Sequence, residues 1–145
     1  MPQRPIRSII EGKKVLAAPQ TTTVAQAARL MKQRHVSAIL VVDGEGKLTG
    51  IFTERDALFR VIAADRSPKA TPIAEVMTAH PHSVDPDRPF VQALVMMHEG
   101  GFRHVPVVRG GRPVGMVSAR DALDLDWKDC ASELERRERI GASIG

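Results

Sequence analysis

The chain is poor in several residue types. Its 145 residues include one cysteine, one tryptophan, four phenylalanines and no tyrosine. The single cysteine, Cys130, excludes an internal disulfide framework and fits a reducing compartment. Hydrophobic residues nevertheless make up 43% of the chain, which is enough for a packed interior built from aliphatic side chains and methionine. The composition therefore predicts an ordered globular protein with an aliphatic core.

Long apolar segments are also missing. No run approaches the roughly 18 residues that a membrane-spanning helix needs. The first ten residues, MPQRPIRSII, contain no long apolar segment and do not resemble a secretory signal. These absences predict a cytoplasmic protein without a membrane partner.

Charge of one sign is not concentrated anywhere in the chain. The formal net charge is +4, but acidic residues are interleaved with basic ones. No basic run carries the aromatic residues on which a single-strand nucleic-acid binder stacks bases. The pattern argues against a nucleic-acid partner and stays compatible with a small anionic ligand such as a nucleotide.

What the chain does contain is a repeat. The segment GIFTERDAL (50–58) returns as GMVSARDAL (115–123), 65 positions later. An apolar helix face with the spacing i, i+3, i+4, i+7 precedes each copy. Its members are Val24, Ala27, Ala28 and Met31 in the first half, and Phe90, Ala93, Leu94 and Met97 in the second.

The same order of elements is expected in each half. Strands are predicted at 36–42, 48–52, 105–108 and 113–117, and further helices at about 54–64 and 119–125. A unit of about 60 residues buries too little surface to be stable alone. The sequence therefore predicts an α/β (α+β) fold of two pseudo-symmetric β-α-β-β-α units, packed through their sheets.

The repeat also sets the expected domain boundaries. Unit 1 with an N-terminal lead-in is predicted at 1–64, a linker at 65–71, unit 2 at 72–126, and a charged helical tail at 127–145. The tail has no counterpart in the first half, and its role stays open.

The repeated segment has two interpretations. Thr53-x-x-Asp56 and Ser118-x-x-Asp121 both have the form of a helix capping box, with Gly50 and Gly115 at a close approach in the preceding strand. The same arrangement also suits a nucleotide. The helix N-terminus and hydroxyl would bind phosphate, an adjacent arginine would assist, and the carboxylate would accept from a ribose diol. Spacing alone leaves both interpretations open.

Other candidate sites have less support. His80 and His82 are spaced so that both can lie on one face of a strand, but no third ligand lies near them in sequence, so no metal site is predicted. His35 and His104 precede equivalent strands and are expected to border a cleft. Cys130 has no histidine partner, and no nucleophile with a base is visible. The chain is therefore predicted not to be an enzyme.

The whole repeat resembles a tandem pair of CBS domains, also called a Bateman module, over about residues 6–125. The segments that carry the resemblance are GIFTERD, GMVSARD, RHVSAILVVD (34–43), FRHVPVV (102–108) and VMT (76–78). The resemblance implies two clefts between the units, each able to bind an adenosyl ligand. AMP, ADP or ATP are preferred, and S-adenosylmethionine or NAD are alternatives.

The resemblance also implies which residues line the clefts. One cleft would join Ser118, Arg120 and Asp121 to Val36, Ser37 and Ala38, with a wall from Lys14 to Leu16. The other would join Thr53, Arg55 and Asp56 to His104, Val105 and Pro106, with a wall that includes Thr78, His80 and His82. Backbone groups of the middle strand would contact adenine, the aspartate the ribose, and the hydroxyl and arginine the phosphates.

The implied function is a non-catalytic regulatory module whose ligand shifts the arrangement of the two units and so acts on an unidentified regulated protein. A homodimer is expected, because the helix faces carry more apolar surface than one pair of small sheets covers. The alternative is a structural dimerisation module in which both repeated segments only cap helices. An enzyme acting on its bound nucleotide is the third and weakest interpretation.

Overall fold

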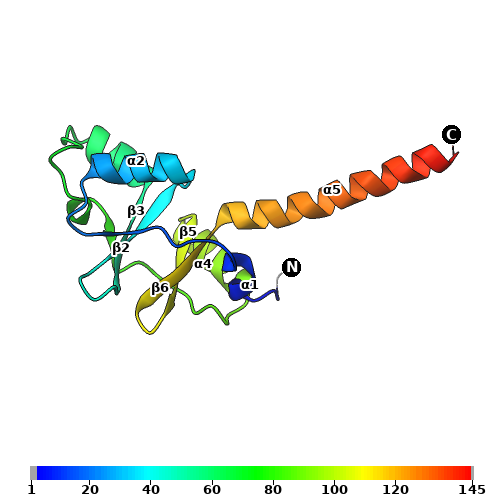
Figure 1. Ribbon diagram of the computed structural model, residues 1–145, viewed down its shortest axis with the longest axis horizontal. Helices are drawn as coiled ribbons and strands as arrows, with labels where there is room; N and C mark the ends of the chain where they lie inside the picture. The colour runs from blue at the N-terminus through cyan, green and yellow to red at the C-terminus, as the bar shows by residue number, and fades with distance from the viewer. Residues whose placement is uncertain (1–2, 145) are drawn as a thin grey trace.

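A computed structural model describes residues 3–144 and shows two small sheets flanked by helices (Figure 1). The first half of the chain contains α1 (Ile6–Ile10), β1 (Ala17–Pro19), α2 (Val24–Arg34), β2 (Ala38–Val42), β3 (Leu48–Thr53), the short helix α3 (Glu54–Asp56) and the π-helix η1 (Ala57–Ile62). The second half contains the 3-10 helix η2 (Ile73–Glu75), β4 (Thr78–Ala79), α4 (Phe90–Gly100), β5 (His104–Arg109), β6 (Arg112–Ser118) and α5 (Ala119–Ile144).

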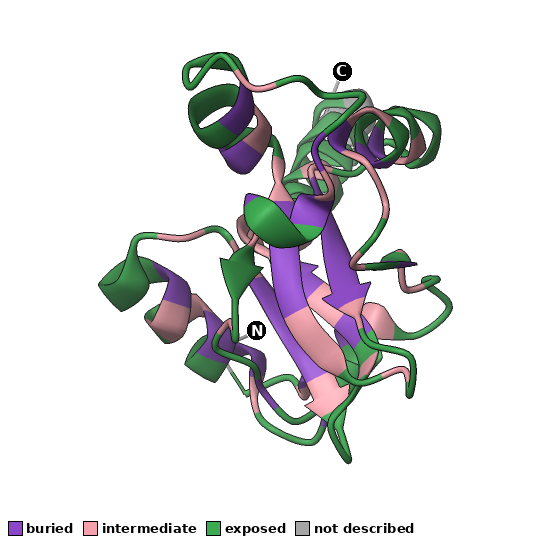
Figure 2. Ribbon diagram, turned by 90° about the vertical axis from the view of Figure 1, so that its left-hand side faces the viewer, coloured by how far each residue is buried: buried purple, intermediate pink, exposed green. Residues whose placement is uncertain are grey.

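The strands form a four-stranded sheet in the order β1-β2-β3-β4 and a two-stranded sheet of β5 and β6. β1 runs parallel to β2, and the other neighbours are antiparallel. A small cluster with Leu40 and Ile51 from the first sheet packs against Met116 of the second. Figure 2 shows the buried strands at the centre, with exposed helix faces outside them. The predicted mixed fold of two like units is confirmed.

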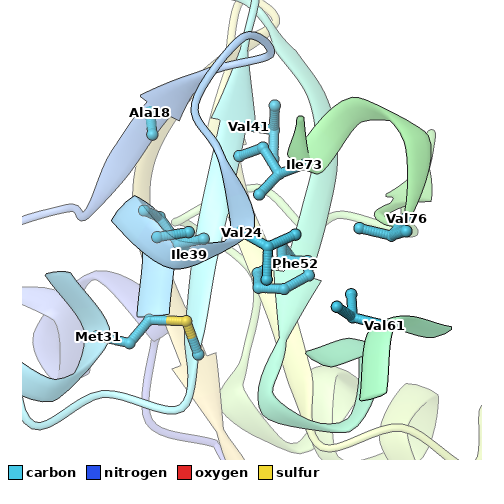
Figure 3. Close-up of a cluster of buried hydrophobic side chains, with 10 residues drawn as sticks. Ala18, Val24, Met31, Ile39, Val41, Phe52, Val61, Ile73 and Val76 are labelled. Carbon is cyan, nitrogen blue, oxygen red and sulfur yellow. The ribbon is translucent and has the colours of Figure 1, made fainter. Parts of the chain in front are cut away.

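Each lead-in packs into the core of the opposite unit. Ile6 and Ile9 of α1 are buried with Phe90 and Val117 of the second unit. Ile73 belongs to the first unit's core, where Figure 3 shows it with Val76 beside the side chains of α2, β2 and β3. This exchange makes the two cores interdependent, because neither is complete without chain from the other half.

The exchange explains why both repeated segments begin with glycine. A Cβ added to Gly115 in β6 would lie 2.8 Å from the side chain of Ile10, the last residue of α1. A Cβ added to Gly50 would collide with Met77, 67 residues after Ile10. The close approach predicted for both glycines is therefore present, and in both units the neighbour is a lead-in side chain.

Local differences from the sequence prediction concern element ends. The first middle strand begins at Ala38 and not at Val36, because His35 ends α2 in a left-handed conformation with φ 54°. The helix expected at 54–64 is three residues of α-helix followed by a π-helix that ends at Ile62. The structure gives no reason for the π-helical turn.

The second unit's last helix is much longer than expected. α5 continues without a break from Ala119 to Ile144, so the predicted tail is the second part of one helix of 26 residues. Ala119, Ala122 and Leu125 pack on the core, and the remainder projects away from the sheets (Figure 1). Within residues 3–144, no helix combines the length and apolar character that crossing a bilayer requires.

The glycine contact predicts a stability effect. Gly115→Ala should lower the free energy of unfolding by about 1–3 kcal/mol, because its methyl group overlaps Ile10 in a packed core. Urea denaturation measures this loss. Gly44→Ala is the control, because no atom lies within 4 Å of its added Cβ. Equal urea midpoints for the two variants would show that Ile10 does not pack tightly against Gly115.

Candidate functional site

Two clefts lie where the two units meet. Cleft 1, of about 1260 Å³, runs between the start of α5, the lead-in after α1 and the segment before β2. Cleft 2, of about 600 Å³, runs between α3, the segment after β4 and the start of β5. Glu54, Arg103 and His104 line both clefts. The two sites are therefore neighbours that share one wall.

Most of the predicted site residues line these clefts. Cleft 1 is lined by Lys14, Leu16, Val36, Ser37, His104, Ser118, Arg120 and Asp121, and cleft 2 by Thr53, Arg55, Asp56, Thr78, His82 and His104. Each cleft thus brings together residues of one unit's helix start with residues beside the other unit's middle strand.

Four predicted residues do not line either cleft. Ala38, Val105 and Pro106 are fully buried, because they lie inside the strands that form the core. His80 is exposed in a left-handed conformation with φ 49°, and its N–H donates to Thr49. The predicted contacts of these four residues with a ligand therefore stay predictions.

Asp56 forms the capping box that the sequence predicted. Its carboxylate Oδ2 accepts from the Thr53 N–H at 3.0 Å and from the Thr53 hydroxyl at 3.1 Å. The Asp56 N–H donates to Thr53 Oγ1 at 3.2 Å, and Arg60 Nε lies 3.5 Å from Oδ1. The buried carboxylate is therefore satisfied by its own helix.

Asp121 is held differently. Its Oδ2 accepts from the Ser118 N–H at 2.7 Å, and its Oδ1 lies 2.9 Å from Lys13 Nζ. Of the two hydrogen bonds in the predicted capping box, the structure of residues 3–144 contains the one to the Asp121 carboxylate but not the one from the Asp121 N–H to the Ser118 hydroxyl. The side chain of Asp121 is 11% exposed, whereas that of Lys13 is 56% exposed. The ion pair thus joins the lead-in to α5 within the lining of cleft 1.

Lys13 is a residue that sequence reasoning missed. The predicted wall began at Lys14, and two adjacent lysines give no means of choosing the one that faces Asp121. The turn after α1 decides it: Gly12 adopts φ 74°, and the Lys13 N–H donates to the Ile10 carbonyl. Because the Ile10 side chain packs against Gly115, the turn places Lys13 close to the start of α5.

Cleft 2 carries aromatic side chains that the sequence did not assign to it. His82 stacks on Phe102 with ring centroids 6.1 Å apart, and the Arg55 guanidinium lies 5.5 Å from the Phe59 ring centroid. All four residues line the cleft. Arg55 and Phe59 meet because they lie one helical turn apart, whereas only the tertiary fold brings His82 to Phe102. Cleft 2 is smaller than cleft 1 and offers stacking surfaces.

The described residues offer no metal centre at these clefts. In residues 3–144, no three His, Cys, Asp or Glu side chains gather closely enough to hold a metal ion. The chemistry of the clefts is that of cations, buried carboxylates and helix N-termini.

Comparison with known proteins agrees with this arrangement. The profile of the CBS domain matches residues 6–63 and again 73–128. The chain belongs to the CBS domain family. As the sequence resemblance indicated, it is a tandem CBS protein.

Individual CBS proteins show how close the likeness is. The CBS domain-containing protein CBSCBSPB1 of Arabidopsis thaliana is 35% identical over 131 residues, which are 90% of this chain and 23% of that protein. The chain thus spans about a quarter of that relative's length. A putative signal-transduction protein with CBS domains from Burkholderia ambifaria has 32% identity and a TM-score of 0.79, over 86% of this chain and 95% of the other.

A further solved structure contains ligands. The CBS domain pair of protein MJ0100, solved in complex with 5′-methylthioadenosine and S-adenosyl-L-methionine, has 26% identity and a TM-score of 0.79. The match covers 88% of this chain and 99% of the other. That CBS pair therefore takes adenosyl compounds.

The wall shared by the two clefts of the CBS pair contains a half-buried histidine, His104. His104 Nε2 lies 2.8 Å from the hydroxyl of Ser37, which directly precedes β2 of the other unit. Burial lowers the pKa of His104 below its usual value of 6.5, and Arg103 acts in the same direction. Glu54 and Asp121 raise it in part. Burial therefore favours the neutral imidazole of His104 over its protonated form.

This histidine predicts a pH dependence of stability. Because the folded-state pKa is depressed, the unfolded chain binds the proton more readily, and stability declines as pH falls below about 6.5. Thermal melting between pH 8 and pH 5 measures the decline. His104→Gln should flatten the curve, and the exposed His98→Gln is the matched control. A His104→Gln curve that keeps the parent's slope would contradict the assignment.

Proposed function

We propose that this CBS pair is a non-catalytic regulatory module that binds an adenosyl ligand between its two units. The observation that carries the proposal is the crossed placement of two buried aspartates. Each begins a helix of one unit and faces the middle strand of the other. The adenosyl compounds bound by the CBS pair of protein MJ0100 support the ligand class.

In cleft 1, each part of a nucleotide has a chemical counterpart. Asp121 would accept hydrogen bonds from the ribose diol. Ser118 and Arg120 stand at the start of α5, where free amide groups and the helix dipole favour phosphate. The backbone around Val36 and Ser37 would contact adenine from the other side of the cleft.

The charge of cleft 1 favours a phosphorylated ligand. Lys13, Lys14, Arg103 and Arg120 line it, against the two carboxylates of Glu54 and Asp121. A surplus of cations attracts AMP, ADP or ATP and disfavours S-adenosylmethionine, whose sulfonium is itself a cation. NAD, which carries two phosphates, is a further alternative.

A structural dimerisation module without ligand is the second candidate. Asp56 supports it, because this carboxylate is already satisfied by Thr53 and Arg60 within its own helix. Asp121 favours ligand binding, because its lysine partner reaches it across an open cleft. The two clefts therefore differ, with cleft 1 the better candidate for a ligand.

Signal transmission would use the contact between the units. A ligand that bridges both cleft walls favours one relative arrangement, and a regulated protein that prefers this arrangement responds to the change in population. We propose that the protein acts as a homodimer, since η1 exposes Leu58, Phe59 and Ile62 and α4 exposes Val95. The single, exposed Cys130 is compatible with a cytoplasmic location.

Substitution of the two aspartates separates ligand binding from capping. Asp121→Asn should lower the affinity for ATP at least tenfold, because a charge-assisted acceptor for the ribose is lost. The melting temperature without ligand should change little. Asp56→Asn should have an effect of different size, because the two clefts differ. Isothermal titration with AMP, ADP, ATP, S-adenosylmethionine and NAD measures both effects.

The alternative predicts another outcome. If the aspartates only cap helices, each substitution costs at most about 1 kcal/mol of stability and has no effect on ligands. Unaltered binding of every adenosyl compound by both single variants and the double variant would remove these residues from the site. Hydrolysis of ATP above a blank would instead indicate an enzyme.

Lys13 offers a test of ligand charge. Lys13→Gln should weaken ATP binding about tenfold, since a cation at the cleft mouth is lost. The same substitution should leave adenosine binding unchanged or stronger, because Asp121 is released for the ribose. Lys69→Gln, an equal charge change at an exposed linker residue, is the control. Equal losses for ATP and adenosine would assign Lys13 a merely structural role.

A further inference from the structure

The wall between the two clefts contains one permanent cation, Arg103. Glu54, Arg103 and His104 line both clefts, and we call these three residues the shared wall. Glu54 is an anion, and burial favours the neutral form of His104. Arg103 is therefore the positive charge of the shared wall that either cleft can use.

The backbone fixes the place of Arg103 between the clefts. Its carbonyl accepts from the N–H of Ala119 at 3.0 Å, and Ala119 is the first residue of α5. Arg103 thus lies beside the helix start that borders cleft 1. Its neighbours in the chain, Phe102 and His104, both line cleft 2. One short segment before β5 therefore borders both clefts.

The guanidinium of Arg103 is available to a ligand. The residue is exposed, and its side chain forms no hydrogen bond or ion pair with any of residues 3–144. Its charge nevertheless acts on the shared wall: burial is the main cause that lowers the pKa of His104, and Arg103 adds to this effect. Because charge interactions near a solvated surface decay over a short distance, the guanidinium lies close to the imidazole that borders both clefts.

Cleft 2 has no surplus of positive charge without Arg103. Apart from this residue, and with histidine neutral, its charged side chains are two arginines and two carboxylates, namely Arg55, Arg60, Glu54 and Asp56. Arg60 is also engaged within the protein, since it lies 3.5 Å from Asp56 and donates to the Met77 carbonyl at 2.9 Å. A phosphorylated ligand in cleft 2 therefore depends on Arg103.

Cleft 1 keeps a surplus of positive charge without Arg103. Lys13, Lys14 and Arg120 remain there, against two carboxylates. The start of α5 adds free amide groups and the positive end of the helix dipole. A phosphorylated ligand is therefore attracted more strongly by cleft 1 than by cleft 2.

Unit 1 has no cation at the place of Arg103. Its equivalent backbone link runs from the N–H of Glu54, the first residue of α3, to the carbonyl of Ser37 at 3.0 Å. Serine carries no charge, so the repeat does not supply a second shared cation. Two phosphorylated ligands would have to compete for Arg103.

We propose that Arg103 is a phosphate-binding residue shared by the two clefts, and that a phosphorylated nucleotide in cleft 1 withdraws it from cleft 2. Cleft 2 then lacks a cation surplus and has a negative charge beside it, which opposes a second phosphorylated ligand. Uncharged adenosine meets neither obstacle, and the rings of His82 and Phe102 stay available to its base. The inference rests on the proposed function and assigns a ligand class to each cleft.

NMR signals of two histidines can follow the clefts separately, because His35 lines cleft 1 alone and His82 lines cleft 2 alone. In the full-length protein, ATP should shift the His35 signals first. The His82 signals should shift only at ATP concentrations at least about tenfold higher. Adenosine should shift the His82 signals at the same concentrations whether or not ATP fills cleft 1.

Asp121→Asn tests the coupling between the clefts. This substitution weakens ATP binding in cleft 1 and so leaves Arg103 to cleft 2. The His82 signals should then respond at ATP concentrations at least about fivefold lower than in the parent. A His82 response that Asp121→Asn does not change would show independent clefts and overturn the inference alone. No response of either histidine to ATP would overturn it together with the proposed function.

Arg103→Gln tests the shared cation. It should weaken the His82 response to ATP at least about tenfold and leave the response to adenosine unchanged, and Asp121→Asn should have no further effect on His82 in this background. Arg103→Lys keeps the charge and should retain most of the ATP response. Arg29→Gln, an equal charge change at an exposed residue of α2 that lines neither cleft, is the matched control. Equal losses for ATP and adenosine would assign Arg103 a merely structural role and refute the proposal.

Discussion

The contact between each lead-in and the other unit's strand is the constraint on which the rest of the structure depends. Ile10 lies on Gly115 and Met77 lies opposite Gly50, so that a methyl group at either glycine would overlap its neighbour. These contacts continue the exchange that puts α1 in the second unit's core and η2 in the first unit's core. The same exchange carries the chain past the mouth of each cleft. Folding of the pair and construction of the clefts are therefore one event.

Equivalent positions acquire different chemistry through this exchange. Asp56 and Asp121 occupy the same place in the repeat, and both are buried at a helix start. Asp56 finds its cation, Arg60, one turn along its own helix, whereas Asp121 finds Lys13 across the cleft, 108 residues away. A ribose bound as proposed at Asp121 would compete with Lys13 for this carboxylate. Pseudo-symmetry of the fold thus does not make the two clefts equivalent.

The sequence predicted the features that rest on local pattern. The repeat gave the number of units and their mixed fold, the Thr53-x-x-Asp56 spacing predicted a capping box that forms in full, and most of the expected residues line the clefts. The predicted start of the first middle strand at Val36 was wrong, since the left-handed His35 delays β2 until Ala38. The tail prediction missed that α5 is continuous, although residues 119–140 contain no glycine or proline that would interrupt a helix. The break was expected because the equivalent helical segment of the first unit is short and ends at Ile62.

Sequence by itself thus determined the duplicated architecture, the helix starts and the helical character of the charged tail, because these follow from spacing within a few turns or strands of chain. Tertiary structure alone decided that Lys13 rather than Lys14 meets Asp121, that Phe59 and Phe102 line cleft 2, and that His104 lies half-buried beside Ser37. Each of these contacts joins segments whose separation in space depends on how the lead-ins cross between the units. The lead-ins cross where Ile10 packs against Gly115 and Met77 packs against Gly50. These contacts form only when both units are folded together, so no single segment of the sequence specifies them.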